Sequence, residues 1–264
     1  MHQDLIAYAD DTAVPINGST WAELACKTSV KLNKIYSWLY KNQLILNIKK
    51  SVFITFGNYT DSVPENIEIK MNGQKLERVN CSKYLGLIYD FNMKWDLHVN
   101  SIVKRTKYLV YVFYRLKNVL TKNQMLQIYY GLFHSIAAYG VIGWGGLYQC
   151  HYEKLERIQN RILKIIGIET EDKNRPLNIK QVFVLNAIVR LYKELKNEFN
   201  TAVYDTRFKS VSVPRYALTI GQRSYEYYAK KYFNEIPNYL KNLNVNQKVL
   251  KNKLKEVIKV FKID

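Results

Sequence analysis

The sequence predicts an α+β fold, with a β-rich front third and a helical remainder. Up to about residue 95, short apolar runs alternate with turn-forming residues, which is typical of small hairpins. Beyond it, apolar residues recur every three or four positions, the spacing of amphipathic helices. The chain has 264 residues, of which 48% are hydrophobic, so it can bury a sizeable core.

The composition is strongly basic. Lys and Arg number 40 against 22 Asp and Glu, which gives a formal net charge of +18. Such a charge attracts polyanions, and 22 tyrosines supply rings that can stack on bases, so nucleic acid is the partner that composition favours. A coding bias toward Lys, Asn and Ile explains the same composition, and that alternative stays open.

Cysteine use and hydropathy exclude other classes of protein. The three cysteines are widely spaced and form no Cys-x-x-Cys pair, which predicts neither a disulfide framework nor a zinc site, and favours a reducing, intracellular compartment. No secretory signal pattern opens the sequence. Residues 128–148 carry no Lys, Arg, Asp or Glu, as a membrane-spanning segment would require. The five glycines in this stretch instead favour a buried helix followed by a turn.

Two adjacent aspartates stand between two β-favouring runs near the start. Residues 5–8 and 12–16 flank Asp10 and Asp11, so we expect a hairpin with the carboxylates at its tip. Adjacent carboxylates repel one another unless cations offset the charge, and hard oxygen ligands suit Mg²⁺. Asp-Asp is also an ordinary turn former, and this stretch alone favours that interpretation.

Caps and turns predict the remaining elements of the front third. Thr20 and Glu23 form a capping-box pattern that opens a helix to about Lys41. Asn72-Gly73 predicts a type I′ hairpin turn, because both residues tolerate positive φ. We further expect strands over 44–46, 51–56 and 83–90, a turn over 47–50 and a loop over 58–66.

The helical part begins near residue 98. We expect helices over about 98–117, 121–136, 155–166, 177–199 and 246–261, with an irregular segment over 200–216. The first of these helices has an apolar face and an opposite basic face. Its basic residues are candidates for phosphate contacts, although plain solvation explains any single one of them: Lys104, Arg105, Lys107 and Arg115.

The order of several short motifs resembles the second half of a reverse transcriptase from non-LTR retrotransposons, the jockey-like and LINE-like elements. Each motif is short, but together they extend over nearly the whole chain. They are Tyr8-Ala9-Asp10-Asp11, residues 46–51, the Asn72-Gly73 hairpin, residues 83–86, Tyr139-Gly140 with Trp144-Gly145, residues 155–164, residues 221–225, and Ile236-Pro237.

This resemblance implies roles for particular residues. Asp10 would be the principal metal ligand of motif C and Asp11 its less direct neighbour, with Mg²⁺ as the cofactor. Lys50 would be the motif D lysine that assists the leaving pyrophosphate; a solvated turn lysine is the alternative, and Lys49 adjoins it. The primer grip would comprise Tyr84, Leu85 and Gly86, for which a buried bulged strand is the alternative.

The resemblance also implies an architecture and partners. Residues 1–57 would be a partial palm with the Asp10 hairpin and motif D, 58–95 a hairpin and primer-grip region, 96–200 a helical thumb, and 201–264 a basic region ending in a helix. The partners would be an RNA template, a DNA primer and deoxynucleotides, without a membrane. The family implies action in the nucleus.

The sequence departs from the family pattern at its start. Only seven residues precede Tyr8, which leaves no room for the motif A strand and its metal-binding aspartate. We therefore expect a fragment that is inactive alone in two-metal nucleotidyl transfer, with an unpaired strand edge beside the Asp10 hairpin. The alternative is a non-enzymatic, basic nucleic-acid-binding module or a decayed relic.

Overall fold

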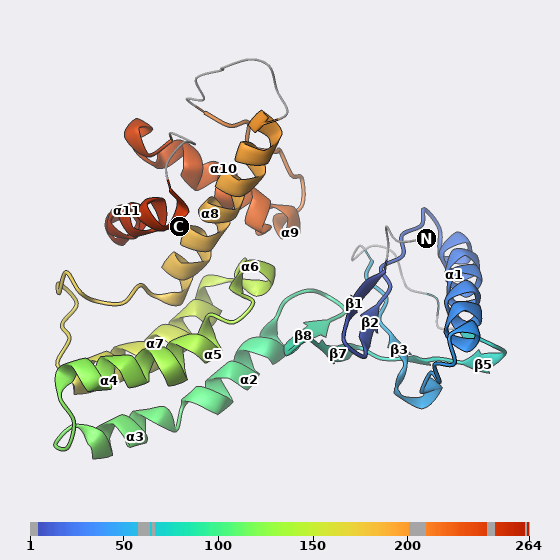
Figure 1. Ribbon diagram of the computed structural model, residues 1–264, viewed down its shortest axis with the longest axis horizontal. Helices are drawn as coiled ribbons and strands as arrows, with labels where there is room; N and C mark the ends of the chain where they lie inside the picture. The colour runs from blue at the N-terminus through green and yellow to red at the C-terminus, as the bar shows by residue number, and fades with distance from the viewer. Residues whose placement is uncertain are drawn as a thin grey trace. The chain divides into compact units, whose positions relative to one another are not determined.

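The computed structural model describes residues 5–57, 64, 67–200, 210–241, 246–261 and 263 (Figure 1). The chain divides into two compact units, Met1–His98 and Val99–Asp264. The first contains small strand pairs and one long helix, and the second is helical among its described residues. The α+β class predicted from the sequence is thereby confirmed.

Unit 1 contains separate two-stranded sheets. Among the residues of this unit that the structure describes, three pairs are antiparallel and one is parallel. The antiparallel pairs are β1 (Ile6–Tyr8) with β2 (Asp11–Ala13), β4 (Lys70–Met71) with β5 (Gln74–Lys75), and β7 (Cys81–Tyr84) with β8 (Leu87–Asp90), and the parallel pair is β3 (Val52–Phe53) with β6 (Glu77–Arg78).

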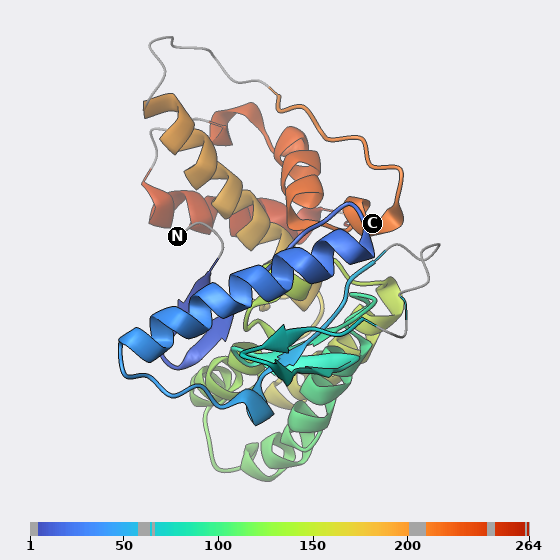
Figure 2. The same cartoon turned by 90° about the vertical axis from the view of Figure 1, so that its right-hand side faces the viewer.

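Helix α1 (Trp21–Lys41) packs against the β4–β5 hairpin (Figure 2). Thr20 caps its start by accepting a hydrogen bond from the Glu23 N–H, as predicted, whereas the Glu23 carboxylate accepts from the Ser19 N–H and not from Thr20. Asn42 caps the end of the helix. The hairpin buries Ile69, Met71 and Leu76. The partly buried side chains that cover them come from the helix, from the segment after it and from β3: Leu32, Ile35, Tyr36, Leu46, Ile48, Phe53 and Ile67.

The Asn72-Gly73 turn is confirmed in detail. Both residues have positive φ, 48° and 74°, as a type I′ turn requires. The Asn33 side chain of α1 accepts a hydrogen bond of 3.0 Å from the Asn72 N–H, which ties the turn to the helix. A local sequence signal is therefore reinforced by a contact between residues far apart in the chain.

Several strand predictions for unit 1 are wrong. Residues 44–46 form no strand, because Leu46 turns inward to the α1 core and the chain proceeds into the 3-10 helix η1 (Ile48–Lys50). The run 51–56 pairs only over Val52–Phe53. Residues 83–90 are not one strand but the arms of the β7–β8 hairpin, which turns at Leu85 (φ 47°) and Gly86 (φ 82°). Most of the predicted loop, 58–63 and 65–66, lies outside the described residues.

Unit 2 is built from helices, with α2 beginning just before its boundary. The elements are α2 (Asp96–Thr106), α3 (Leu109–Leu116), α4 (Lys122–Ile128), the π-helical η2 (Tyr129–His134), α5 (Ser135–Ala137), α6 (Val141–Trp144), α7 (Gln149–Ile166), α8 (Ile179–Asn200), α9 (Thr219–Gln222), α10 (Tyr225–Glu235), the 3-10 helix η3 (Asn238–Leu240) and α11 (Gln247–Val260).

The predicted helices mostly form, with different boundaries. The helix expected over 98–117 is broken between α2 and α3. The structure has a capping box at Thr121, a left-handed Gly167 after α7, and Asn246 as the N-cap of α11. Of the segment expected to be irregular, 210–216 has no helix or strand, whereas 201–209 lies outside the described residues. Helix α10 was not predicted.

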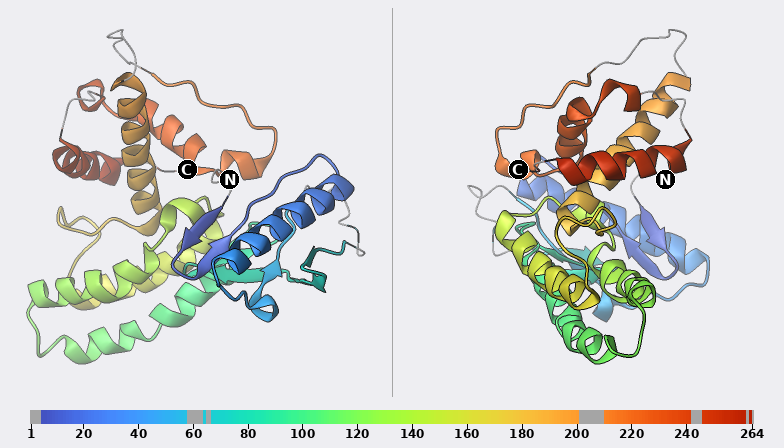
Figure 3. Two further views of the ribbon diagram at one scale, coloured as in Figure 1. Left: turned by 45° about the vertical axis from the view of Figure 1, so that its right-hand side comes forward. Right: turned by 90° about the vertical axis from the view of Figure 1, so that its left-hand side faces the viewer.

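Two groups of packed helices form the core of unit 2 (Figure 3). Helix α7 packs against α3 and α4, and α8 packs against α10 and α11. Gln159 of α7 is fully buried, and its amide nitrogen donates to the Tyr129 hydroxyl and to the Leu177 carbonyl, each at 2.9 Å. This side chain therefore joins three segments by hydrogen bonds inside an apolar core.

A glycine allows the α9–α10 segment to approach α6 and α7. A Cβ atom placed on Gly146 would lie 1.7 Å from the carbonyl oxygen of Arg223, so only glycine fits. The Arg223 guanidinium lies 3.9 Å from the centre of the Tyr148 ring. Two motifs that carried the family resemblance, Trp144-Gly145 and residues 221–225, thus flank one packing contact.

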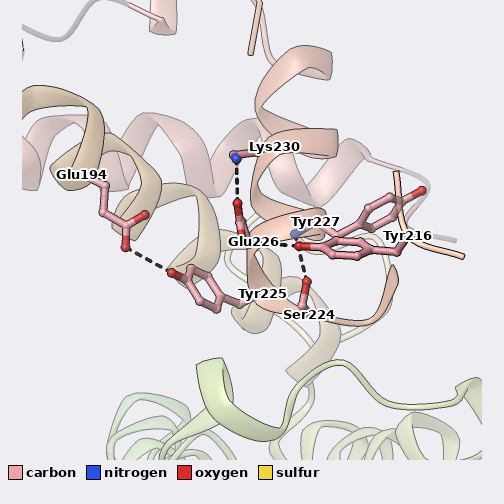
Figure 4. A network of polar contacts seen from close by, with 7 residues as sticks. All are labelled: Glu194, Tyr216, Ser224, Tyr225, Glu226, Tyr227 and Lys230. Atoms are coloured by element: carbon pink, nitrogen blue, oxygen red, sulfur yellow. Dashed lines mark hydrogen bonds and ion pairs between the residues drawn. The ribbon is translucent and has the colours of Figure 1, made fainter. Parts of the chain in front are cut away.

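Polar contacts fix the start of α10 (Figure 4). The Ser224 hydroxyl caps the helix by accepting from the Tyr227 N–H. Tyr225 donates to Glu194 of α8 at 3.2 Å, which connects the two helices. The Glu226 carboxylate forms an ion pair with Lys230 at 2.7 Å and accepts a longer hydrogen bond from the Tyr216 hydroxyl. The contact with Lys230 holds the pKa of the Glu226 carboxyl below its ordinary value.

Candidate functional site

The two predicted metal ligands lie at the tip of the β1–β2 hairpin. Tyr8 pairs with Asp11 across the two strands, and Ala9 and Asp10 form the turn between them. Ala9 has a φ of 52°, in the left-handed region that side chains other than glycine seldom occupy. The predicted hairpin is confirmed, and its second strand begins one residue early, at Asp11.

Both carboxylates are accessible. Asp10 and Asp11 are exposed, and within the described ranges neither side-chain carboxylate has a hydrogen-bond or ion-pair partner. Oxygen donors free of protein partners can bind a hard cation such as Mg²⁺, so these two residues fit a divalent metal as part of its ligand set. The described residues contain no group of three or more His, Cys, Asp or Glu that could hold a metal ion.

A tyrosine of the predicted primer grip contacts the strand that leads to the aspartates. The Tyr84 hydroxyl donates to the carbonyl oxygen of Ile6 in β1, at 3.1 Å. Leu85 and Gly86 follow it directly, at the turn of the β7–β8 hairpin. Residues that stand almost eighty positions apart in the sequence are therefore neighbours in unit 1.

Lys50 is positioned by a different part of unit 1. It ends η1, where the Asn47 side chain accepts a bond of 3.3 Å from its N–H, and it is exposed. Ile48 of the same turn packs on the α1 core. Among the described residues, no hydrogen bond or ion pair joins Lys50 to Asp10 or Asp11.

A third aspartate has a structural role that sequence reasoning missed. Asp90 ends β8, is 6% exposed, and its carboxylate accepts bonds from the N–H groups of Lys94 (2.9 Å) and Trp95 (2.8 Å). Met93 and Trp95 both have positive φ, so this carboxylate holds a strained turn before α2. The sequence signal was Asp90 followed by Asn92, a pair typical of turns.

The predicted phosphate-binding residues are all at the surface. Lys104 and Arg105 lie in the last turn of α2, Lys107 follows the helix and Arg115 lies in α3, and each of the four is exposed. Sequence reasoning overlooked the exposed tyrosines among them, because a tyrosine in an amphipathic helix reads equally well as core. The buried side of α3 uses Leu109 and Phe113, which belong to the apolar face expected from the sequence.

Comparison with known proteins finds three similar retrotransposon polymerases. The chain is 24% identical over 206 residues to the RNA-directed DNA polymerase from mobile element jockey of Drosophila melanogaster, an alignment that covers 73% of this chain and 22% of that protein. It is 25% identical over 175 residues to the jockey polymerase of Drosophila funebris, covering 62% of this chain and 18% of that protein. It is 25% identical over 166 residues to the probable RNA-directed DNA polymerase from transposon BS of Drosophila melanogaster, covering 61% and 18%.

These similarities bear out the resemblance stated from the motifs. The chain spans about a fifth of the length of the curated relatives it matches. No family model matches the sequence, and no solved structure is detectably similar. Within the described part of the chain, no helix has both the length and the apolar character that a membrane crossing requires.

Proposed function

We propose that this chain is a segment of an RNA-directed DNA polymerase of a non-LTR retrotransposon, and that Asp10 and Asp11 bind Mg²⁺ in it. The observation that carries the proposal is the β1–β2 hairpin, which presents two exposed, adjacent carboxylates after a strained residue. Strained backbone concentrates at functional sites, where the surrounding structure holds it in place. The similarity to the jockey and BS polymerases supports the same assignment.

Different residues of the chain would have different roles in nucleotidyl transfer. The metal ions, when bound, supply a Lewis acid for the primer 3′-hydroxyl and offset charge on the phosphates. Asp10 and Asp11 would hold them. Tyr84, Leu85 and Gly86 would position the primer strand near the hairpin, a placement that the Tyr84–Ile6 contact supports. Lys50 would stabilise the leaving pyrophosphate by its charge.

Two carboxylates are an incomplete two-metal site. The family resemblance implies a further aspartate on an earlier palm strand, which would complete the ligand set in the longer protein. We therefore propose that these 264 residues bind nucleic acid but do not incorporate nucleotides alone. RNA template, DNA primer and deoxynucleotides would be substrates of the whole polymerase, acting in the nucleus.

The metal assignment is tested by Mn²⁺ binding, followed by electron paramagnetic resonance as a substitute for Mg²⁺. Asp10→Asn and Asp11→Asn should each weaken Mn²⁺ binding to the chain. Glu77→Gln is the matched control, because Glu77 is an exposed carboxylate on β6 of the same unit. Equal Mn²⁺ affinity in all four proteins would exclude a metal site at the hairpin.

The polymerase assignment is tested by primer extension on an RNA template with the full reading frame that contains this chain. Asp10→Asn should abolish Mg²⁺-dependent incorporation while RNA–DNA duplex binding persists, and Glu77→Gln should retain both. Incorporation that survives Asp10→Asn would refute the catalytic role.

A second candidate function is non-enzymatic binding of nucleic acid. The exposed basic residues of α2 and α3 favour it, since they need no metal site to contact phosphates. The affinity of such a module for nucleic acid would fall steeply with salt concentration and would be the same in Asp10→Asn as in the wild type. An absence of any incorporation by the full reading frame, together with this salt dependence, would select the second function over the first.

A further inference from the structure

Three exposed tyrosines follow one side of the α3 helix. Tyr108 directly precedes its first residue, and Tyr111 and Tyr114 follow at intervals of three residues, with 60%, 66% and 56% of their surfaces exposed. Residues three apart are neighbours on a helix surface, so the rings form a continuous stripe. Because Leu109 and Phe113 fill the buried side of α3, the stripe is the side of the helix that faces solvent.

Positive charge surrounds this stripe. Lys104 precedes Tyr108 by four residues, and Lys107 and Arg115 stand four residues before and after Tyr111. The Lys117 ammonium lies 4.4 Å from the centre of the Tyr114 ring. No aspartate or glutamate occurs between residues 97 and 152, so α2 after its first residue and the whole of α3 carry only positive side-chain charge.

We propose that Tyr108, Tyr111 and Tyr114 form a stacking platform for the unpaired bases of a single-stranded nucleic acid, whose phosphates the neighbouring Lys and Arg contact. This inference rests on the proposed nucleic-acid function and specifies its partner. Successive rings lie ~4.5 Å apart along the helix axis, and a stacked strand rises ~3.4 Å per nucleotide, so consecutive bases can reach consecutive rings.

The tyrosines distinguish a single strand from a duplex. In a duplex the base faces are already stacked on one another, and its outer surface offers mainly phosphates, which Lys and Arg contact without help from aromatic rings. An unpaired strand exposes both base faces and phosphates, which are complementary to this surface. Stacking is also tolerant of base identity, since every base has a π-face.

The same charges argue against a second copy of this chain as the occupant. Two copies that met through α3 would bring like-charged Lys and Arg side chains together, with no carboxylate of the stripe to offset them. A polyanion instead gains from every one of these charges. Charge complementarity therefore selects a nucleic acid.

The test is fluorescence anisotropy of the whole chain with labelled 12-nucleotide oligo(U), oligo(dT) and an RNA–DNA duplex of equal length. Tyr111→Ala should weaken binding of the single strands about tenfold, whereas Tyr111→Phe keeps a ring and should bind within about twofold of the wild type. Tyr239→Ala, which removes an exposed tyrosine of the same unit outside the stripe, should change nothing. Duplex affinity and its salt dependence should be the same in all four proteins.

Different failures have different meanings. Equal losses of single-strand and duplex binding in Tyr111→Ala, or no loss of single-strand binding in a Tyr108, Tyr111 and Tyr114 triple alanine variant, would overturn the stacking platform. The nucleic-acid function would survive if Lys107→Gln and Arg115→Gln still weakened binding of both ligands and reduced the salt slope. A wild-type chain that binds neither ligand at low salt would overturn both proposals. Preference for oligo(U) over oligo(dT), or the reverse, would show which strand the platform takes.

Discussion

Gly146→Ala should destabilise unit 2 far more than its single added methyl group suggests. The new Cβ would lie 1.7 Å from the Arg223 carbonyl oxygen, well inside contact distance, and the opposing atom is backbone, so it cannot rotate away. Overpacking in a close-packed region costs about 1–3 kcal/mol, and a backbone clash belongs at the upper end. Separation of the two segments would also weaken the Arg223–Tyr148 contact, worth about 1 kcal/mol. We expect a loss of about 3–4 kcal/mol in the free energy of unfolding.

Gly131→Ala is the matched control, with the opposite sign. A Cβ on Gly131 meets nothing within 4 Å, and this residue lies in the helical η2 with ordinary φ. Replacing a helical glycine by alanine stabilises by about 0.5–1 kcal/mol. Urea unfolding gives the free energies, and hydrogen exchange of residues 141–148 and 219–235 locates the change. Equal stabilities of the two variants, or unchanged exchange in both segments of Gly146→Ala, would refute the packing argument.

Two further predictions concern a buried carboxylate and a half-buried histidine. Asp90→Ala leaves the Trp95 N–H without its acceptor and should lower the free energy of unfolding, measured in urea, by about 2 kcal/mol. Asp90→Asn should be intermediate in stability between the wild type and Asp90→Ala. A loss below about 0.5 kcal/mol in Asp90→Ala would contradict the role of Asp90. Burial, with smaller contributions from Lys255 and Lys251, lowers the pKa of His134 below its ordinary 6.5, so the unfolded chain binds this proton more readily. The stabilisation due to neutral His134 is therefore complete above pH 6.5 and is lost as the pH falls below it. The Tm of His134→Gln should drop less than the Tm of the wild type between pH 7.5 and 5. Equal drops in Tm would exclude a contribution of His134 to the pH dependence of stability.

The elements that could be predicted from the sequence are those set by local chemistry. Thr20 and Thr121 cap helices by bonds to residues three positions on, and Asn72-Gly73 reverses the chain by its own φ preference. Gly167 ends α7 for the same local reason. Each signal involves only neighbours in the chain, so the rest of the fold was not needed to interpret it.

The missed features depend on distant contacts. A hairpin and a single strand have the same alternation, so residues 83–90 gave no sign that they fold back at Leu85 and Gly86. Helix α10 is rich in tyrosines, and its position depends on Glu194 of α8, which the sequence does not place beside it. Asp90 resembled an ordinary strand end because its acceptor role needs the particular turn that follows.

In the candidate site, too, local features were predicted from the sequence and contacts between distant residues were not. The Asp10 hairpin is local and was predicted, whereas the hydrogen bond from Tyr84 to Ile6 could not be, since it joins two hairpins separated by α1 and β3. The apolar face that Leu109 and Phe113 bury was expected from the sequence, but the tyrosine stripe of α3 was missed because a tyrosine in an amphipathic helix reads equally well as core. The family resemblance located the candidate residues but not the contacts between them.

The geometry of the Asp10 hairpin, where we propose a metal site, depends on more than the four residues of its tip. A two-stranded hairpin is marginally stable alone, and the left-handed Ala9 adds a cost of about 1–3 kcal/mol. Among the described residues β1 and β2 pair only with each other, and Ile6 and Tyr8 are exposed. The Tyr84 hydroxyl satisfies one carbonyl of β1, whereas the two adjacent carboxylates at the tip repel each other. In the polymerase that we propose, a bound cation would offset the repulsion between the two carboxylates and a further strand would cover the open edge, so both should stabilise the hairpin.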